Sequence, residues 1–152
     1  MLNFIVIGGA FEPDLYNCST YIKDSNTFIL LDCGENIFEQ ILRNNLLSGI
    51  NKIIIILTHF HTDHVGSLGS LIFYCDKLGI KDIKIIYPNL KKLRLLINLY
   101  GLNYCNIKLY MPTELKDFFI QEFVQKHSRM EAYGFTFDEY GEITNYNDIY
   151  RQ

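Results

Sequence analysis

Apolar residues along this 152-residue chain fall into short runs rich in Ile, Phe and Tyr, which alternate with segments of helical period. Runs of roughly four to eight such residues predict strands, and apolar positions spaced three and four apart predict amphipathic helices. The predicted strands are 3–7, 19–23, 27–32, 52–57, 83–87, 107–110, 118–125 and 135–138, and the predicted helices are 35–47, 67–78 and 90–100. This order indicates one mixed α/β domain over residues 1–152.

Two local patterns near the start of the chain support this order. The sequence Asp24-Ser25-Asn26 separates the second and third predicted strands and is typical of a three-residue hairpin turn. Gly49 follows the first predicted helix, where a glycine commonly ends a helix. A β-hairpin is therefore expected to lead into a helix.

The run from Lys52 to Leu57 is almost entirely Ile, as expected of a strand that is buried on both faces. It leads directly into Thr58 and the hexapeptide His59-Phe60-His61-Thr62-Asp63-His64. Three His and one Asp within six residues, in a chain with four His, are not typical of a surface loop. The hexapeptide is therefore the main candidate for chemistry.

The spacing within the hexapeptide predicts two metal half-sites. In extended backbone, residues i and i+2 point the same way, so His59 and His61 present two imidazoles to one ion. The turn that follows directs Asp63 and His64 toward a second ion. Nitrogen and oxygen donors of this kind favour Zn²⁺, with Mn²⁺ and Fe²⁺ as alternatives.

Two segments of the chain resemble the metallo-β-lactamase superfamily. Residues 57–68, Leu-Thr-His-Phe-His-Thr-Asp-His-Val-Gly-Ser-Leu, look like its HxHxDH signature, and residues 29–35, Ile-Leu-Leu-Asp-Cys-Gly-Glu, are most similar to the ribonuclease Z-like branch. The resemblance implies an αββα sandwich built from two similar halves. The sequence covers the first half, the motif and the opening of the second, so the second half is expected to be incomplete.

The resemblance also implies roles for residues outside the hexapeptide. Asp32 would orient a metal ligand from behind, and His127, ahead of an aromatic and glycine-containing stretch, would be the third histidine of the first metal. Asp148 would bridge the two metals, with Glu142 as the alternative. The four histidines are then all assigned, so the family's final histidine for the second metal has no counterpart.

A metal-dependent hydrolase is the function that the resemblance implies. A metal-bound water would attack a phosphodiester, in RNA or in a small molecule such as a cyclic nucleotide, with Asp63 orienting the water or accepting its proton. A thioester or lactone hydrolase stays open as an alternative. So does a degenerate, non-catalytic domain that keeps one metal and acts as a binding module, for which the missing histidine is the argument.

Composition and charge indicate which binding partners and which cellular location to expect. A net charge of −3 argues against nucleic-acid binding by bulk charge. Five basic residues close together in the chain form either a phosphate-attracting surface or an ordinary solvated helix face: Lys81, Lys84, Lys91, Lys92 and Arg94. Four scattered cysteines favour reduced thiols in the cytoplasm, and no apolar run predicts a membrane span. A homodimer is the expected way to complete the half-built sandwich.

Overall fold

The structure, a computed structural model, describes residues 3–6, 17, 19–103, 105–114, 120–125, 132–137 and 144–146. The elements follow one another as β1 (Asn3–Val6), β2 (Ser19–Asp24), β3 (Thr27–Leu31), α1 (Ile37–Arg43), β4 (Lys52–Ile56), α2 (Thr62–Val65), α3 (Leu68–Lys77), β5 (Asp82–Ile86), α4 (Leu90–Leu99), β6 (Ile107–Tyr110), the 3-10 helix η1 (Pro112–Glu114), β7 (Ile120–Gln125), β8 (Ala132–Phe137) and β9 (Thr144–Tyr146).

Two sheets organise these elements. The first has six strands in the order β1-β2-β3-β4-β5-β6, in which β1, β2 and β3 are antiparallel and β3 to β6 are parallel. The second has three antiparallel strands in the order β7-β8-β9. Helices α1, α3 and α4 lie in the connections between parallel strands, because parallel neighbours need a crossover.

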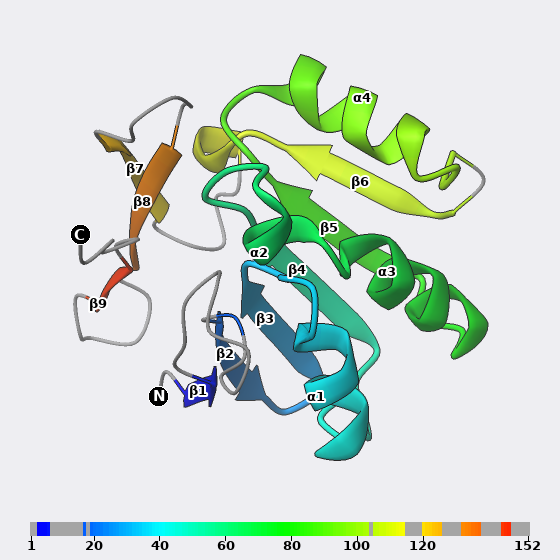
Figure 1. The fold of residues 1–152 in the computed structure, drawn as a ribbon. Coiled ribbons are helices and arrows are strands. Elements are labelled where there is room, and N and C mark those ends of the chain that lie inside the picture. Colours follow the sequence, from blue (N-terminus) through cyan, green and yellow to red (C-terminus); the bar gives the residue numbers. More distant parts are fainter. Residues whose placement is uncertain are drawn as a thin grey trace.

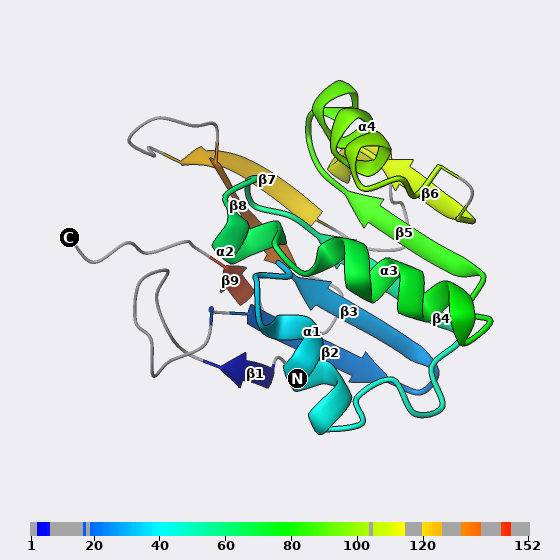
Figure 2. The same ribbon diagram turned by 45° about the vertical axis from the view of Figure 1, so that its right-hand side comes forward.

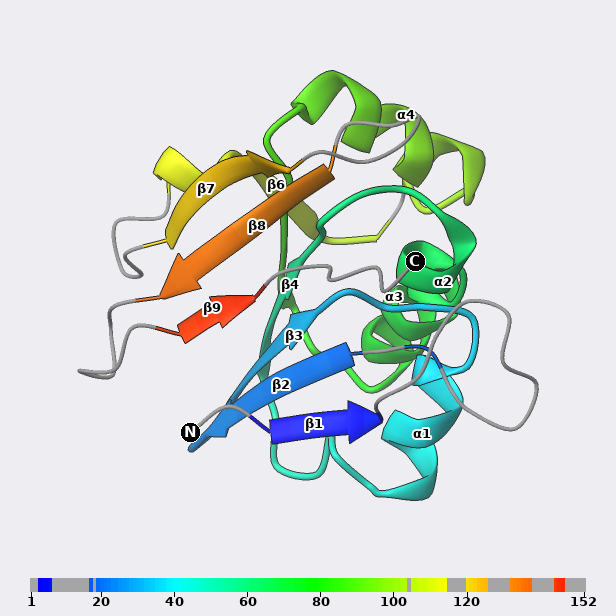
Figure 3. The same cartoon turned by 60° about the vertical axis from the view of Figure 1, so that its left-hand side comes forward.

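The elements form layers, which are visible in three views (Figures 1, 2 and 3). Figure 3 shows the first sheet nearly edge-on, with α1, α3 and α4 on one side and β7, β8 and β9 on the other. In the part of the chain that the structure describes, no α-helix follows α4. The described layers are thus helices, sheet and sheet, in agreement with the predicted α/β class and with three of the four layers of an αββα sandwich.

The parallel strands form the centre of the core. Ile53, Ile54, Ile55 and Ile56 of β4 are all buried, so side chains on both faces of this strand are covered. Both faces of β3 and β5 contribute buried aliphatic residues too, and α1 and α3 pack Ile37, Ile41, Leu68, Leu71 and Ile72 against the sheet. The Ile-rich run therefore has the central place that its composition predicts.

Several predicted boundaries were wrong. The helix expected from 35 to 47 is only Ile37–Arg43, because Asn45 takes a left-handed conformation at φ 49° and the amide of Leu46 donates to the carbonyl of Ile41 at 3.0 Å. The turn between β2 and β3 has two residues, since Asp24 pairs directly with Thr27. The sequence also did not predict α2 or β9, and β8 begins before the predicted start at Phe135.

No helix among the described residues is long and apolar enough to cross a membrane.

Candidate metal centre

The candidate site lies where two neighbouring parallel strands end. Asp32 follows β3 and Thr58-His59 follows β4 after Leu57, and the paired strands end together at Leu31 and Ile56. The amide of Asp32 donates to the carbonyl of Ile56 at 2.9 Å, so pairing continues to the carboxylate-bearing residue. The carboxyl ends of parallel strands are a frequent place for functional groups.

The first two histidines of the motif face each other. Nε2 of His59 lies 3.1 Å from Nδ1 of His61, and their ring centroids are 4.7 Å apart. Phe60, between them, points the other way and packs on Tyr87 of the core with ring centroids 4.3 Å apart. This alternation is what extended backbone produces, and His59 is fully buried at the base of the pair.

The next two residues of the motif form a second pair. Nε2 of His64 lies 3.2 Å from Oδ2 of Asp63. The backbone is not the simple turn expected from the sequence, because the one-turn helix α2 starts directly after His61 and carries both side chains. The rings of His59 and His64 have centroids 4.0 Å apart, so the two pairs lie side by side.

The buried carboxylate of Asp32 contacts the motif from behind. Its Oδ1 accepts from the amide of Thr58 at 2.8 Å, and its Oδ2 accepts from the hydroxyl of Thr58 at 2.8 Å. Nδ1 of His64 lies 2.8 Å from the same Oδ2. Asp32 is fully buried and has a φ of 60°, a left-handed backbone that Asp tolerates better than most residues, and the hydroxyl of Ser19 donates to its carbonyl at 3.0 Å.

Ser67 joins the segment after β3 to the segment after the motif. Its hydroxyl donates to the carbonyl of Gly34 at 2.5 Å and accepts from the amide of Phe38 at 3.0 Å. The amide of Cys33 donates to the carbonyl of His64 at 2.7 Å, and the amide of Ser67 donates to the carbonyl of Cys33 at 3.1 Å. Burial raises the pKa of the Cys33 thiol to about 12, so this thiol stays neutral inside the junction.

Gly34 is required by how closely these segments approach. A Cβ on Gly34 would lie 2.0 Å from the carbonyl oxygen of Asp63 and 2.6 Å from the side chain of Asn17. Sequence reasoning did not single out Thr58, Ser67 or Gly34. Their signals were a threonine directly after the apolar run 53–57, and a serine and a glycine within the two segments that carry the resemblance.

Both pairs suit a metal ion by distance and by donor type. Two nitrogen ligands on a tetrahedral zinc ion are about 3.3 Å apart, given Zn–N distances of about 2.0–2.1 Å. The 3.1 Å and 3.2 Å separations in the two pairs are close to this value. The described residues hold no group of three or more His, Cys, Asp and Glu side chains that could hold one ion, and each pair offers two donor atoms.

The remaining predicted ligands lie outside the described residues: His127, Asp148 and Glu142. The stretch that holds His127 is flanked by Gln125 and Ala132, which pair with each other across β7 and β8. The amide of the next residue, Tyr133, donates to the carbonyl of Thr58 at 3.1 Å. The second sheet therefore contacts Thr58, the residue before the motif, at the described end of this stretch.

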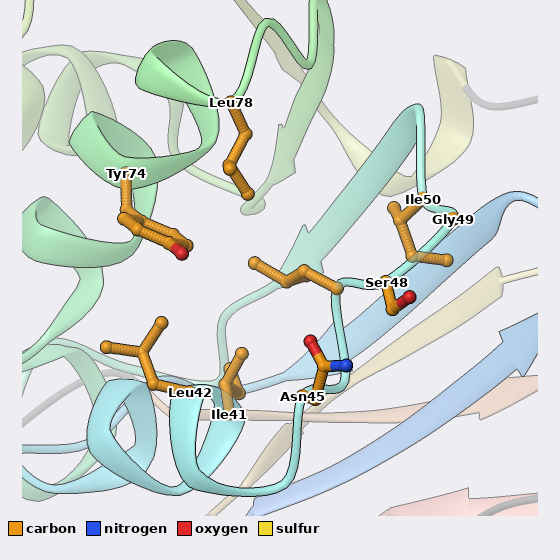
Figure 4. A pocket seen from close by; sticks show the side chains of 9 residues that line it. Ile41, Leu42, Asn45, Ser48, Gly49, Ile50, Tyr74 and Leu78 are labelled. Carbon is orange, nitrogen blue, oxygen red and sulfur yellow. The ribbon is translucent and has the colours of Figure 1, made fainter.

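A pocket of about 350 Å³ lies away from the motif (Figure 4). It is lined by residues of α1, of α3 and the position after it, and of the segment between α1 and β4: Ile41, Leu42, Asn45, Leu47, Ser48, Gly49, Ile50, Tyr74 and Leu78. This segment leads into the start of β4, whereas the motif leaves its other end. The lining contains no His, Cys, Asp or Glu, so the pocket is not a candidate metal centre.

The basic run is divided among the exposed Lys81, which directly precedes β5, Lys84 in β5, and three residues of α4. Lys91, Lys92 and Arg94 are exposed on α4, and Lys84 of β5 has its ammonium group 5.8 Å from the centre of the Tyr110 ring. The exposure of these basic side chains is consistent with both predicted alternatives, a solvated helix face and a phosphate-attracting surface.

Comparison with known proteins identifies the fold class first. Over 93% of the chain, the structure matches the metallo-β-lactamase fold protein YhfI from Bacillus subtilis with a TM-score of 0.70 at 16% identity. It matches the short form of human tRNase Z with a TM-score of 0.68 at 20% identity, and a diphosphatase of the PhnP family with 0.61 at 22%. The chain has the metallo-β-lactamase fold, which confirms the predicted resemblance.

The family model named Anti-Pycsar protein Apyc1 matches residues 1–145, and the chain belongs to this family. Curated relatives include Apyc1 from Bacillus phage 010DV004, 32% identical over 91 residues, which are 58% of the chain and 35% of that protein. The ribonuclease Z of Metallosphaera sedula is 37% identical over 82 residues, 53% of the chain and 26% of that protein. The octanoyltransferase of Porphyromonas gingivalis is 27% identical over 147 residues, 84% of the chain and 27% of that protein.

The chain thus spans a part of these proteins. The matched stretches cover 26–35% of the three curated relatives and 59–67% of the three solved structures.

Proposed function

We propose that this protein is a metal-dependent hydrolase of phosphodiesters, with zinc as the metal and Mn²⁺ or Fe²⁺ as alternatives. The proposal rests on two donor pairs that lie beside each other just after the end of β4. His59 and His61 approach to 3.1 Å, and Asp63 and His64 approach to 3.2 Å. The rings of His59 and His64, one from each pair, have centroids 4.0 Å apart. Two metal half-sites so close to each other suit attack on one phosphoryl group.

Each residue has a proposed role. His59, His61 and His127 would hold the first ion and Asp63 and His64 the second, and Asp148 would be the ligand that both share, with Glu142 as the alternative. When bound, such ions would supply a water of lowered pKa and would polarise the phosphoryl oxygen. The carboxylate of Asp63 orients the attacking water or accepts its proton, and Asp32 holds the ring of His64 in place.

The relatives support a substrate that reacts at phosphorus. Proteins named ribonuclease Z, tRNase Z and diphosphatase are similar to this chain, and ribonucleases and diphosphatases cleave bonds to phosphorus. We propose RNA or a small phosphodiester such as a cyclic nucleotide, in the cytoplasm. A second copy of the chain stays the predicted protein partner, and sedimentation velocity tests whether the chain forms a dimer.

A panel of substrates tests the function. The metal-loaded protein is assayed on bis(p-nitrophenyl) phosphate, on 3′,5′-cyclic nucleotides and on short single-stranded RNA, beside Asp63→Asn and the matched exposed control Asp76→Asn. The proposal expects turnover of at least one phosphodiester that falls 100-fold or more in Asp63→Asn and is unchanged in Asp76→Asn. No turnover of any of them, or equal activity in Asp63→Asn, would contradict it.

Acyl-ester hydrolysis is the second candidate, and one observation favours it. The match to the octanoyltransferase covers 84% of the chain, and that name describes acyl transfer. An acyl thioester and a lactone therefore belong in the same panel, and turnover of these alone would select this candidate. Absence of all turnover would favour the non-catalytic metal-binding module instead.

A further inference from the structure

We infer that Thr58 is a positioning residue: its hydroxyl fixes the tautomer of His59, so that one buried carboxylate, Asp32, orients a histidine in each half-site. This inference rests on the proposed metal site and adds a residue to it. Thr58 does not itself touch the proposed ions or substrate.

The hydroxyl of Thr58 lies at the centre of three polar groups. Its Oγ1 is 2.8 Å from Oδ2 of Asp32, 3.1 Å from Nδ1 of His59 and 3.3 Å from Nδ1 of His64. His64 has a shorter contact, because its Nδ1 is 2.8 Å from Oδ2 of Asp32. The carboxylate thus contacts the second half-site directly and the first half-site through Thr58.

Counting protons gives each bond a direction. An ionised carboxylate can only accept, so the single hydroxyl proton of Thr58 goes to Asp32 and the proton of His64 is on Nδ1. The hydroxyl oxygen then has lone pairs left for His59, which must carry its proton on Nδ1 to donate to it. Both rings therefore carry a proton on Nδ1, and the neutral form of each ring presents an unprotonated Nε2.

These two Nε2 atoms are the ones that take part in the donor pairs. Nε2 of His59 faces Nδ1 of His61 at 3.1 Å, and Nε2 of His64 faces Oδ2 of Asp63 at 3.2 Å. A metal ion binds the neutral imidazole nitrogen that carries no proton. The Thr58 hydroxyl therefore keeps His59 in the form that can bind.

Burial makes the hydroxyl hard to replace. Asp32, Thr58 and His59 each have 0% of their surface exposed, so bulk water does not reach this contact. In Thr58→Val, Nδ1 of His59 loses this acceptor. The ring is then expected to move its proton to Nε2 and donate it to Nδ1 of His61, which blocks the ligand atom.

The experiment is to read the imidazole tautomers by ¹⁵N NMR in the full chain, uniformly labelled and metal-free. The variants are Thr58→Val, Thr58→Ser, which keeps the hydroxyl, and Thr62→Val, the same change at an exposed threonine of the motif. We expect the Nδ1–H form of His59 in the wild type, Thr58→Ser and Thr62→Val, and the Nε2–H form in Thr58→Val. An Nε2–H form in the wild type, or an unchanged Nδ1–H form in Thr58→Val, would overturn the inference. The wild-type spectrum decides even where Thr58→Val does not fold.

Chelator competition with Zn²⁺ provides the second readout. Loss of an outer contact to a histidine ligand typically weakens metal binding about 10–100-fold, so Thr58→Val should lose this much while Thr58→Ser and Thr62→Val bind as the wild type does. Equal affinity in Thr58→Val would overturn the inference. If the wild type binds no metal, the proposed function fails, while the tautomer spectra still test Thr58.

Discussion

Removing the buried carboxylate of Asp32 should destabilise the fold itself, even without metal. The carboxylate accepts from the amide and the hydroxyl of Thr58, each at 2.8 Å, and lies 2.8 Å from Nδ1 of His64. Hydrogen bonds to a charged group contribute about 1.5–3 kcal/mol each, and a buried donor without a partner costs about 1–3 kcal/mol.

Two substitutions distinguish the contribution of the Asp32 carboxylate to stability from that of the left-handed backbone at this position. Asp32→Asn keeps the shape and tolerates the φ of 60°, and it retains one oxygen acceptor, so we expect a loss of about 2 kcal/mol. Asp32→Ala leaves three donors without this acceptor and puts a less tolerant residue in the left-handed region, so we expect about 5 kcal/mol.

The assay is urea unfolding followed by circular dichroism in the presence of EDTA, so that bound metal does not contribute to the free energy of unfolding. Asp76→Asn, on the exposed face of α3, is the control and should change it by less than about 0.5 kcal/mol. An Asp32→Asn loss no larger than that of the control would refute the idea that this carboxylate organises the end of the sheet.

Three further predictions concern the surroundings of the motif. Ser67→Ala removes the contacts to Gly34 and Phe38 and should lower the free energy of unfolding by about 2 kcal/mol, whereas the exposed Ser70→Ala should not; equal effects would contradict the role of Ser67. Gly34→Ala puts a Cβ 2.0 Å from a carbonyl oxygen and should lower the free energy of unfolding by more than about 3 kcal/mol. Gly49→Ala, at a φ of +77° with open space around it, should lower it by about 1 kcal/mol. Thermal unfolding compares the two variants, and similar midpoints would contradict the close approach at Gly34. Burial raises the pKa of Cys33 and Cys75 from 9.0 to about 12, so ionisation favours the unfolded chain, and stability that is complete below pH 9 falls as the pH rises toward 12. At pH 11 the loss should be about 3 kcal/mol per thiol, urea curves from pH 8 to 11 measure it, and unchanged midpoints would show that these thiols are not buried as described.

The sequence was sufficient to predict the central strand of the first sheet and the relative orientation of the first two histidines of the motif. An almost unbroken Ile run predicted β4, and its burial on both faces follows from that composition. The i, i+2 spacing of His59 and His61 predicted that they share a side, and the structure has them 3.1 Å apart. These features depend on residues close together in the chain.

Features that depend on distant residues could not be predicted in the same way. Thr58 contacts Asp32 across 26 positions, where the pairing of β3 with β4 brings them together. Ser67 contacts Gly34 across 33 positions, beside the backbone hydrogen bonds of Cys33 to His64 and Ser67. The early end of α1 depends on the left-handed conformation of Asn45, which its side chain permits but does not require. The ligand roles of all the predicted site residues stay predictions, and His127 and Asp148 in addition lie outside the described residues.

The most direct test of the proposed metal centre is the metal content of the chain, measured by plasma emission spectroscopy after purification without chelator. The wild type, His61→Ala for the first pair and Asp63→Ala for the second pair are compared under the same conditions. We predict about two equivalents of zinc in the wild type and about one less in each variant. Less than about half an equivalent in the wild type, or the same content in all three proteins, would contradict a metal centre built on these two pairs.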